Sequence, residues 1–135
     1  MATKITVSAI INAPLQKVWD SYTNPRHIVH WNFASTDWCC PWATNDLQVG
    51  GKYCARMEAK DGSFGFEFEA IYSEIISENK ITYVGDGREI TTLFEVKSNS
   101  TQLTTILDAE TENPIELQQE GWQAILNNFK KYVEQ

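Results

Sequence analysis

The C-terminal part of the chain has the clearest pattern of hydrophobic and polar positions. From Leu117 it reads LQQEGWQAILNNFKKYVEQ, with Gln, Asn, Lys and Glu between large apolar residues. The apolar residues that recur at helical spacing are Trp122, Ile125, Leu126, Phe129 and Val133. This spacing predicts a long amphipathic helix with a single apolar stripe.

Much of the preceding chain alternates between apolar and polar residues, as half-buried strands do. The segments with this alternation are residues 3–11, 52–60, 64–76, 80–84, 88–97 and 102–109. The sequences Asp61–Gly62 and Asp86–Gly87 separate neighbouring segments and are typical of hairpin turns. Consecutive hairpins predict an antiparallel sheet with one wet face and one buried face. The final helix is the element long enough to cover the buried face.

Two short helices are predicted after the first strand. Asn12 is expected to cap the first, over residues 15–22, because an Asn side chain can accept a hydrogen bond from a free N–H group of the first turn. The second is expected over residues 25–30. The order of elements therefore predicts one α+β domain spanning residues 1–135.

Residues 31–50 fit neither a helical nor a strand period, although they hold Trp31, Trp38 and Trp42. Loops mostly face water, so a loop this rich in tryptophan is expected to pack onto the open end of the core. If the sheet curls around the final helix, a cavity lies between them. We therefore predict that residues 31–45 gate this cavity.

Charge and composition exclude several classes of partner. The formal net charge of the chain is −7, which disfavours nucleic acid and anionic lipid surfaces. The sequence has no apolar run of membrane-spanning length, and its first residues do not show the pattern of a signal peptide, so neither membrane insertion nor a signal peptide is expected. The three cysteines, an odd number, do not form a disulfide framework. Together these observations predict a cytoplasmic protein, as a monomer or a weak homodimer.

Candidate catalytic and metal-binding residues do not form a recognisable motif. His27 and His30 have a usable spacing, but the adjacent Cys39 and Cys40 are poorly placed to bind one zinc ion. The glutamates of segment 64–76 alternate with apolar residues and are expected on the wet face. The sequence contains no phosphate-binding Gly-rich loop and no dinucleotide fingerprint. We therefore predict no catalytic residue, no metal and no organic cofactor.

Five stretches together resemble a known superfamily. They are INAPLQKVWDSYTNPRHIVHW (11–31), DLQVGGKY (46–53), AKDGSFGFEFEAIYSEI (59–75), DGREITTLFEV (86–96) and ENPIELQQEGWQAILNNFKKYVE (112–134). The set resembles the START-like superfamily, also called SRPBCC, which has the helix-grip fold. Within it, the chain is similar to the family named for the C-terminal domain of the activator of the ninety-kilodalton heat-shock protein ATPase.

This resemblance implies a curved antiparallel sheet of about six strands that wraps around the C-terminal helix and encloses a hydrophobic cavity. Members of the superfamily bind lipids, sterols, polyketides or other apolar molecules, and some are cyclases or hydrolases. The co-chaperone role belongs to longer proteins with an additional N-terminal domain.

Three functions remain open from the sequence. The first is binding of a small hydrophobic or amphipathic molecule, the second is docking of a protein partner, and the third is a cyclase or hydratase activity inside the cavity. The side chains expected to line the cavity are Trp31, Trp38, Trp42, Tyr53, Phe66, Phe68, Thr92, Phe94, Thr105, Trp122 and Leu126. The same aromatic residues would also suit a solid core, because aromatic side chains dominate ordinary cores.

Overall fold

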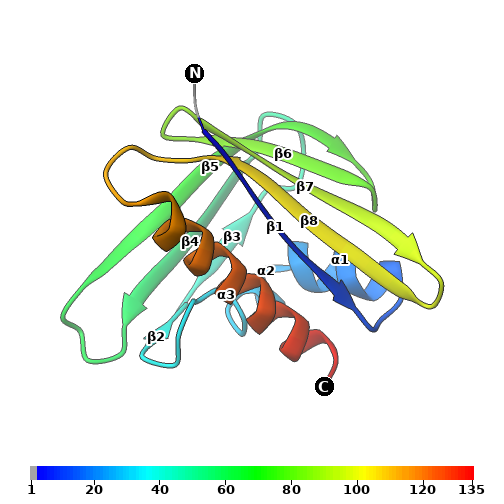
Figure 1. Cartoon of the computed structure of the whole chain (residues 1–135), viewed down its shortest axis with the longest axis horizontal. Helices are drawn as coiled ribbons and strands as arrows, with labels where there is room; N and C mark the ends of the chain where they lie inside the picture. Colours follow the sequence, from blue (N-terminus) through cyan, green and yellow to red (C-terminus); the bar gives the residue numbers. More distant parts are fainter. Residues whose placement is uncertain (1–2) are drawn as a thin grey trace.

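The computed structural model describes residues 3–135 and has an α+β architecture, with a curled antiparallel sheet around one long helix (Figure 1). The strands are β1 (Lys4–Ile11), β2 (Trp38–Cys39), β3 (Ala43–Asn45), β4 (Lys52–Ala59), β5 (Gly65–Ile76), β6 (Lys80–Gly85), β7 (Arg88–Lys97) and β8 (Ser100–Asp108). The helices are α1 (Leu15–Thr23), α2 (Pro25–Ile28) and α3 (Ile115–Val133). The predicted fold class is confirmed, with two more strands than expected.

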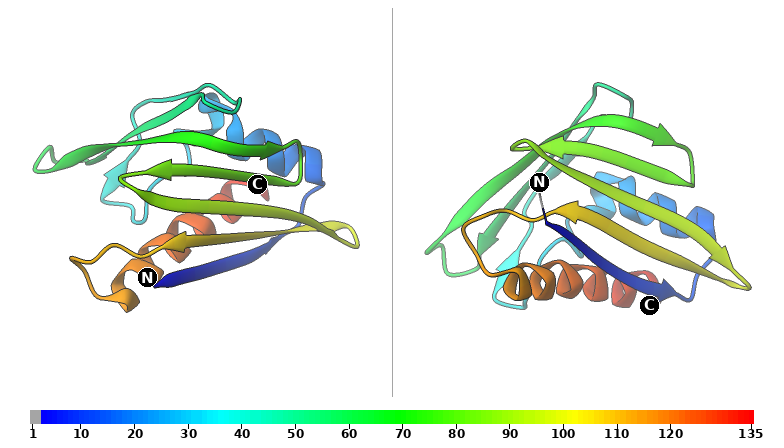
Figure 2. Two further views of the ribbon diagram at one scale, coloured as in Figure 1. Left: turned by 90° about the horizontal axis from the view of Figure 1, so that it is seen from above. Right: turned by 45° about the horizontal axis from the view of Figure 1, so that its top comes forward.

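The sheet has eight strands in the order β1-β8-β7-β6-β5-β4-β2, with β3 paired to β4. Figure 2 shows the sheet curling so that its concave side faces the helices. The β5–β6 pairing shifts register between Tyr72 and Glu74, and such an irregularity bends and twists a strand. The β6–β7 hairpin turns at Asp86 and Gly87, whose φ angles of 52° and 71° fit the predicted two-residue turn.

Two local predictions were wrong. Residues 31–50 are not wholly irregular, because β2 and β3 lie within them and pair with β4. These strands are too short to show an alternating pattern in the sequence. Asn12 does not cap α1: the N-cap residue is Pro14, and the Asn12 side chain instead accepts a hydrogen bond from Ser100 Oγ at 3.0 Å.

The C-terminal half of α3 seals one end of the core. Leu126, Phe129 and Val133 are buried there, which continues the apolar stripe predicted for this helix. The Phe129 ring meets the rings of Tyr22 and Trp31 edge-on, at centroid distances of 5.3 and 4.9 Å. One side chain of α3 therefore joins α1 and the segment after α2 to the final helix.

α3 also runs beside β1, the strand at one end of the sheet (Figure 1). Three side chains of α3 donate hydrogen bonds to alternate backbone carbonyls of β1: Gln119 to Thr6, Gln123 to Ser8 and Lys130 to Ile10. The polar face of the helix is thus attached to the backbone of the strand, while its apolar face meets the core. Within residues 3–135, no helix is long and apolar enough to cross a membrane.

Candidate ligand-binding site

A pocket of about 360 Å³ lies between the concave face of the sheet and the N-terminal half of α3. One helical face of α3 lines it, and the residues of this face are Gln118, Gly121, Trp122, Ile125 and Leu126. Their spacing of three or four residues places them on one side of the helix. The pocket therefore lies beside the part of α3 that precedes the buried Phe129.

The opposite wall is aromatic. Tyr53 of β4, Phe68 and Tyr72 of β5, and Tyr83 of β6 all line the pocket. The Tyr83 ring lies 5.4, 5.8 and 5.5 Å from the rings of Tyr53, Phe68 and Tyr72, respectively. The small Ala70 is the register partner of Tyr53, which leaves room between the rings. Together, these side chains form a continuous aromatic surface, here called the aromatic wall.

Three tyrosine hydroxyls around the pocket have partners in the protein. Tyr22 shares a hydrogen bond with Thr92 Oγ1 at 3.4 Å, and Tyr72 donates to Asn45 Oδ1 at 2.8 Å. Tyr53 accepts a hydrogen bond from Asn32 Nδ2 at 3.3 Å. Burial raises the pKa of each of these phenols, so all three stay protonated near neutral pH.

Charged side chains lie at one end of the pocket, where β7 begins and β8 leads into α3. Arg88 and Glu110 both line the pocket there. The Arg88 Nη1 atom donates to the Asp108 carbonyl at 3.4 Å. The rest of the lining is neutral, so the polar rim and the aromatic wall are distinct parts of the same pocket.

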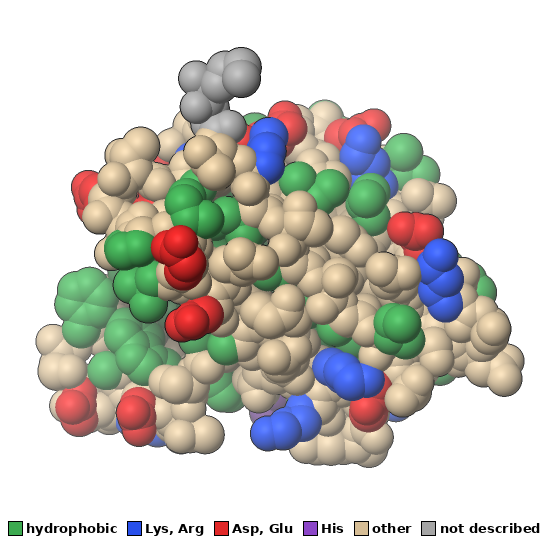
Figure 3. Space-filling view, in the orientation of Figure 1, with side chains coloured by type: hydrophobic (Ala, Val, Ile, Leu, Met, Phe, Trp, Pro, Cys, Tyr) green, Lys and Arg blue, Asp and Glu red, His purple; other side chains and the backbone are tan. Residues whose placement is uncertain are grey.

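Exposed aromatic side chains cluster on the β4–β5 hairpin. The Phe64 and Phe66 side chains are 62% and 42% exposed, and the Trp38 ring lies 5.9 and 6.1 Å from theirs. Figure 3 shows hydrophobic side chains gathered at the left of this face, where the hairpin lies. Phe66 also lines the pocket, so this aromatic patch of Trp38, Phe64 and Phe66 adjoins it.

Seven of the eleven predicted site residues lie on the pocket wall: Trp31, Tyr53, Phe66, Phe68, Thr105, Trp122 and Leu126. The other four, Trp38, Trp42, Thr92 and Phe94, do not line it. Thr92 Oγ1 is buried against Thr105 and Phe94 packs against Trp19, whereas Trp42 is 41% exposed. Thr92 and Phe94 therefore lie on the inner face of the sheet without lining the pocket.

The sequence prediction missed several wall residues. Tyr72 and Tyr83 alternate with outward residues, and this alternation was a signal that could have found them. Tyr22 lies on the apolar face of α1, which is also visible in the sequence. Arg88 and Glu110 carry no such signal, because Arg88 begins β7 and Glu110 lies in the loop after β8, where the path of the chain decides the position.

Among the described residues, one group has the proximity needed to hold a metal ion: Cys54, Glu67 and Glu69. It lies on the outer face of the sheet, away from the pocket. The Glu69 carboxylate is 3.2 Å from Lys52 Nζ, and the Glu67 carboxylate is 4.0 Å from Arg56 Nη1. Lysine and arginine already supply positive charge to both carboxylates, which disfavours a metal ion at this position.

The candidate cysteines and histidines have structural surroundings. Burial raises the pKa of the Cys40 thiol to about 11 and also raises that of Cys54, so neither is an activated nucleophile. His27 Nδ1 shares a hydrogen bond of 2.6 Å with the Tyr132 hydroxyl, and the Tyr132 ring stacks on His30. These histidines therefore attach α2 and the residues that follow it to the end of α3.

Comparisons with known proteins agree on the fold. Residues 12–134 match the model of the family described as Activator of Hsp90 ATPase homolog 1-like protein. The solution structure of an AHSA1-like protein from Aeromonas hydrophila has 40% sequence identity and a TM-score of 0.92, with 98% of this chain and 92% of that chain covered. A solution structure from Cytophaga hutchinsonii has 44% identity and a TM-score of 0.84, covering 97% and 92%, respectively.

A crystal structure from Chromobacterium violaceum extends the likeness at 23% identity, which concerns the fold alone. Its TM-score is 0.87, and the match covers 98% of this chain and 99% of that one. No protein with a curated function is similar enough to the chain to count as a match.

Proposed function

Because the chain belongs to the family of Activator of Hsp90 ATPase homolog 1-like proteins, which is part of the START-like superfamily, we propose that it binds a small hydrophobic molecule between α3 and the sheet. The observation that carries this proposal is the pocket of about 360 Å³ beside the aromatic wall. Small-molecule sites are concave, mostly apolar and supplied with a few polar groups. A volume near the lower end of their usual range fits a ligand of modest size.

The charges around the pocket favour binding over acid–base catalysis. A general acid or base works best with a pKa near the working pH. Burial moves the pKa of the lining tyrosines upward, away from neutrality, and the charged lining residues Arg88 and Glu110 lie outside the aromatic wall. Ligand binding is therefore better supported than the cyclase or hydratase alternative.

Thermal unfolding with a panel of fatty acids, sterols and aromatic compounds tests the proposal. A ligand at 100 times its dissociation constant stabilises the folded protein by about 2.7 kcal/mol, which raises the melting temperature by several degrees. Tryptophan fluorescence should respond to the same ligands, because Trp31 and Trp122 line the pocket. If no compound changes either signal, ligand binding is the wrong function.

A second candidate function is docking of a protein partner, as the name of the matched family suggests. The aromatic patch of Trp38, Phe64 and Phe66 favours this candidate, because exposed aromatic clusters often mark interaction sites. Stimulation of Hsp90 ATPase activity is the direct assay. Phe64→Ser should abolish stimulation, whereas Val96→Ser is a matched control, since both side chains are 62% exposed. Equal activity of both variants would exclude the patch as the docking site.

A further inference from the structure

The Tyr83 hydroxyl differs from the other three tyrosine hydroxyls around the pocket. The residue is only 8% exposed and lines the pocket, yet its hydroxyl has no hydrogen-bond partner within residues 3–135. In the same part of the chain, no side-chain nitrogen or oxygen is both sealed from solvent and without a partner. The Tyr83 oxygen is therefore not sealed from solvent, and its side chain lines the pocket.

Tyr53 adds a second spare donor to the same wall. Its oxygen accepts the hydrogen bond from Asn32, but its own O–H hydrogen has no acceptor among the described residues. The Tyr53 and Tyr83 rings are in contact, with centroids 5.4 Å apart. A carbonyl oxygen has two lone pairs and no hydrogen, which complements a wall with surplus phenol donors.

We propose that Tyr83 donates a hydrogen bond to a neutral carbonyl oxygen of the ligand, so that the pocket selects apolar, ring-bearing ketones, aldehydes or esters. This inference rests on the proposed ligand-binding function. The aromatic wall receives the ring of the ligand by stacking, and the phenol fixes the position of its carbonyl. A buried hydroxyl left without a partner is unfavourable, so a ligand that satisfies it is preferred over one that does not.

A neutral carbonyl fits this wall better than a carboxylate does. No charged residue belongs to the aromatic wall, and the charged lining residues, Arg88 and Glu110, come from the start of β7 and the segment after β8. A carboxylate beside the phenols would lose its hydration without gaining a cation from the aromatic wall. Burial also raises the pKa of Tyr83, which keeps the phenol protonated as a donor across the physiological range.

The test compares 2-acetylnaphthalene with 2-isopropenylnaphthalene, in which a CH₂ group replaces the carbonyl oxygen. Dissociation constants are measured by tryptophan fluorescence for the unmodified protein, Tyr83→Phe and Tyr132→Phe. Loss of one neutral hydrogen bond should weaken ketone binding to Tyr83→Phe by about 2- to 12-fold. The isopropenyl compound should bind Tyr83→Phe at least as tightly as the unmodified protein, because it leaves the Tyr83 hydroxyl without a partner. Tyr132→Phe, which removes a phenol hydroxyl outside the pocket, should affect neither compound.

A second measurement does not depend on any variant. The infrared carbonyl stretch of 2-acetylnaphthalene bound to the unmodified protein should lie below its value in an alkane solvent, because a hydrogen bond weakens the C=O bond. A stretch at the alkane value, or equal effects of Tyr83→Phe on both compounds, overturns the inference while leaving ligand binding intact. If neither compound binds and the wider panel also fails, the proposed function falls, and the inference falls with it.

Discussion

Gly121 is a glycine in the interior of α3, with free space where a side chain would lie. A Cβ atom built there meets no other heavy atom within 4 Å, and the residue lines the pocket. Glycine in a helix interior costs about 1 kcal/mol relative to alanine. Gly121 therefore lowers the helix propensity of α3 at a position where a larger side chain would enter the pocket.

A larger side chain at Gly121 should therefore increase folding stability but decrease ligand affinity. Gly121→Leu should raise the free energy of unfolding by up to about 1 kcal/mol through helix propensity, and it should weaken ligand binding by filling the pocket. Chemical denaturation and ligand titration measure the two effects. Gly121→Ala is the matched control, since it should share the stabilisation but retain binding. Unchanged ligand binding in Gly121→Leu would contradict the assignment of the pocket as the site.

Single residues also show what the sequence could predict about the site. Alternation placed Phe68 and Thr105 on one strand face, Tyr53 was expected at the cavity as an aromatic residue, and all three line the pocket. Phe94 shares the inner face of the sheet but lies beyond the pocket, against α1. The difference is the position along the strand relative to α3, which depends on tertiary packing and leaves no periodic pattern.

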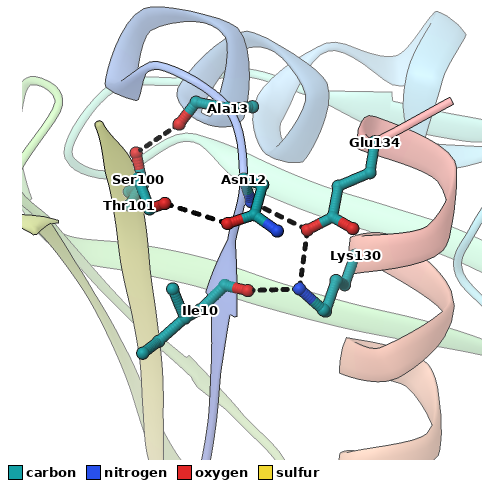
Figure 4. A network of polar contacts seen from close by, with 7 residues as sticks. All are labelled: Ile10, Asn12, Ala13, Ser100, Thr101, Lys130 and Glu134. Carbon is teal, nitrogen blue, oxygen red and sulfur yellow. Dashed lines mark hydrogen bonds and ion pairs between the residues drawn. The ribbon is translucent and has the colours of Figure 1, made fainter. Parts of the chain in front are cut away.

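At the scale of elements, the C-terminal end of α3 is held by one carboxylate. Glu134 Oε2 accepts hydrogen bonds from the Asn12 backbone N–H at 2.7 Å and from Lys130 Nζ at 2.6 Å (Figure 4). These contacts lower the pKa of Glu134. They join the end of the helix to the segment between β1 and α1, which lies at the opposite end of the sequence.

The lowered pKa predicts an acid-dependent loss of stability. A carboxyl group with a lowered folded-state pKa stabilises the protein above its unfolded-state pKa, and this contribution is lost as the pH falls through the folded-state value. Glu134→Gln should therefore reduce the free energy of unfolding by about 0.5–1 kcal/mol at neutral pH, and the difference should vanish in strong acid. Denaturation at several pH values measures it.

Glu120→Gln is the control for this prediction, because Glu120 is exposed on the same helix and makes no ion pair with the residues described. A pH-independent difference between Glu134→Gln and the unmodified protein would show that the carboxylate charge does not hold the end of the helix.

The elements themselves were predictable where their patterns were long. β7 matched its expected bounds, and α3 began two residues before the expected start. β2 and β3 were missed because they form strands by pairing with β4, and their sequences show no alternating pattern. The register shift in β5, which helps to curl the sheet, likewise has no signature in the alternation.

At the scale of the whole molecule, Phe129 is the buried side chain through which α3 packs against α1 and the segment after α2. Phe129→Ala should lower the free energy of unfolding by about 3–5 kcal/mol, because its ring packs against both Tyr22 and Trp31 in the sealed end of the core. Native domains have only about 5–15 kcal/mol in total, so this variant should be close to unfolding.

Denaturant titration followed by tryptophan fluorescence measures this loss. Phe129→Leu keeps most of the apolar volume and should cost less than about 1.5 kcal/mol. Equal losses for the two variants would show that the edge-on ring contacts, rather than the filled volume, hold the helices together.

The hydrogen bonds from α3 to the carbonyls of Thr6, Ser8 and Ile10 also bear on self-association. β1 ends the sheet, and a terminal strand with free backbone groups is a template on which a second chain can add a strand. In this molecule the acceptors on that side are already occupied by side chains of the same chain. Protection against strand addition by a second chain therefore depends on the packing of α3 against β1. A partly unfolded state that releases α3 would expose the free edge of β1 and the core at the same time.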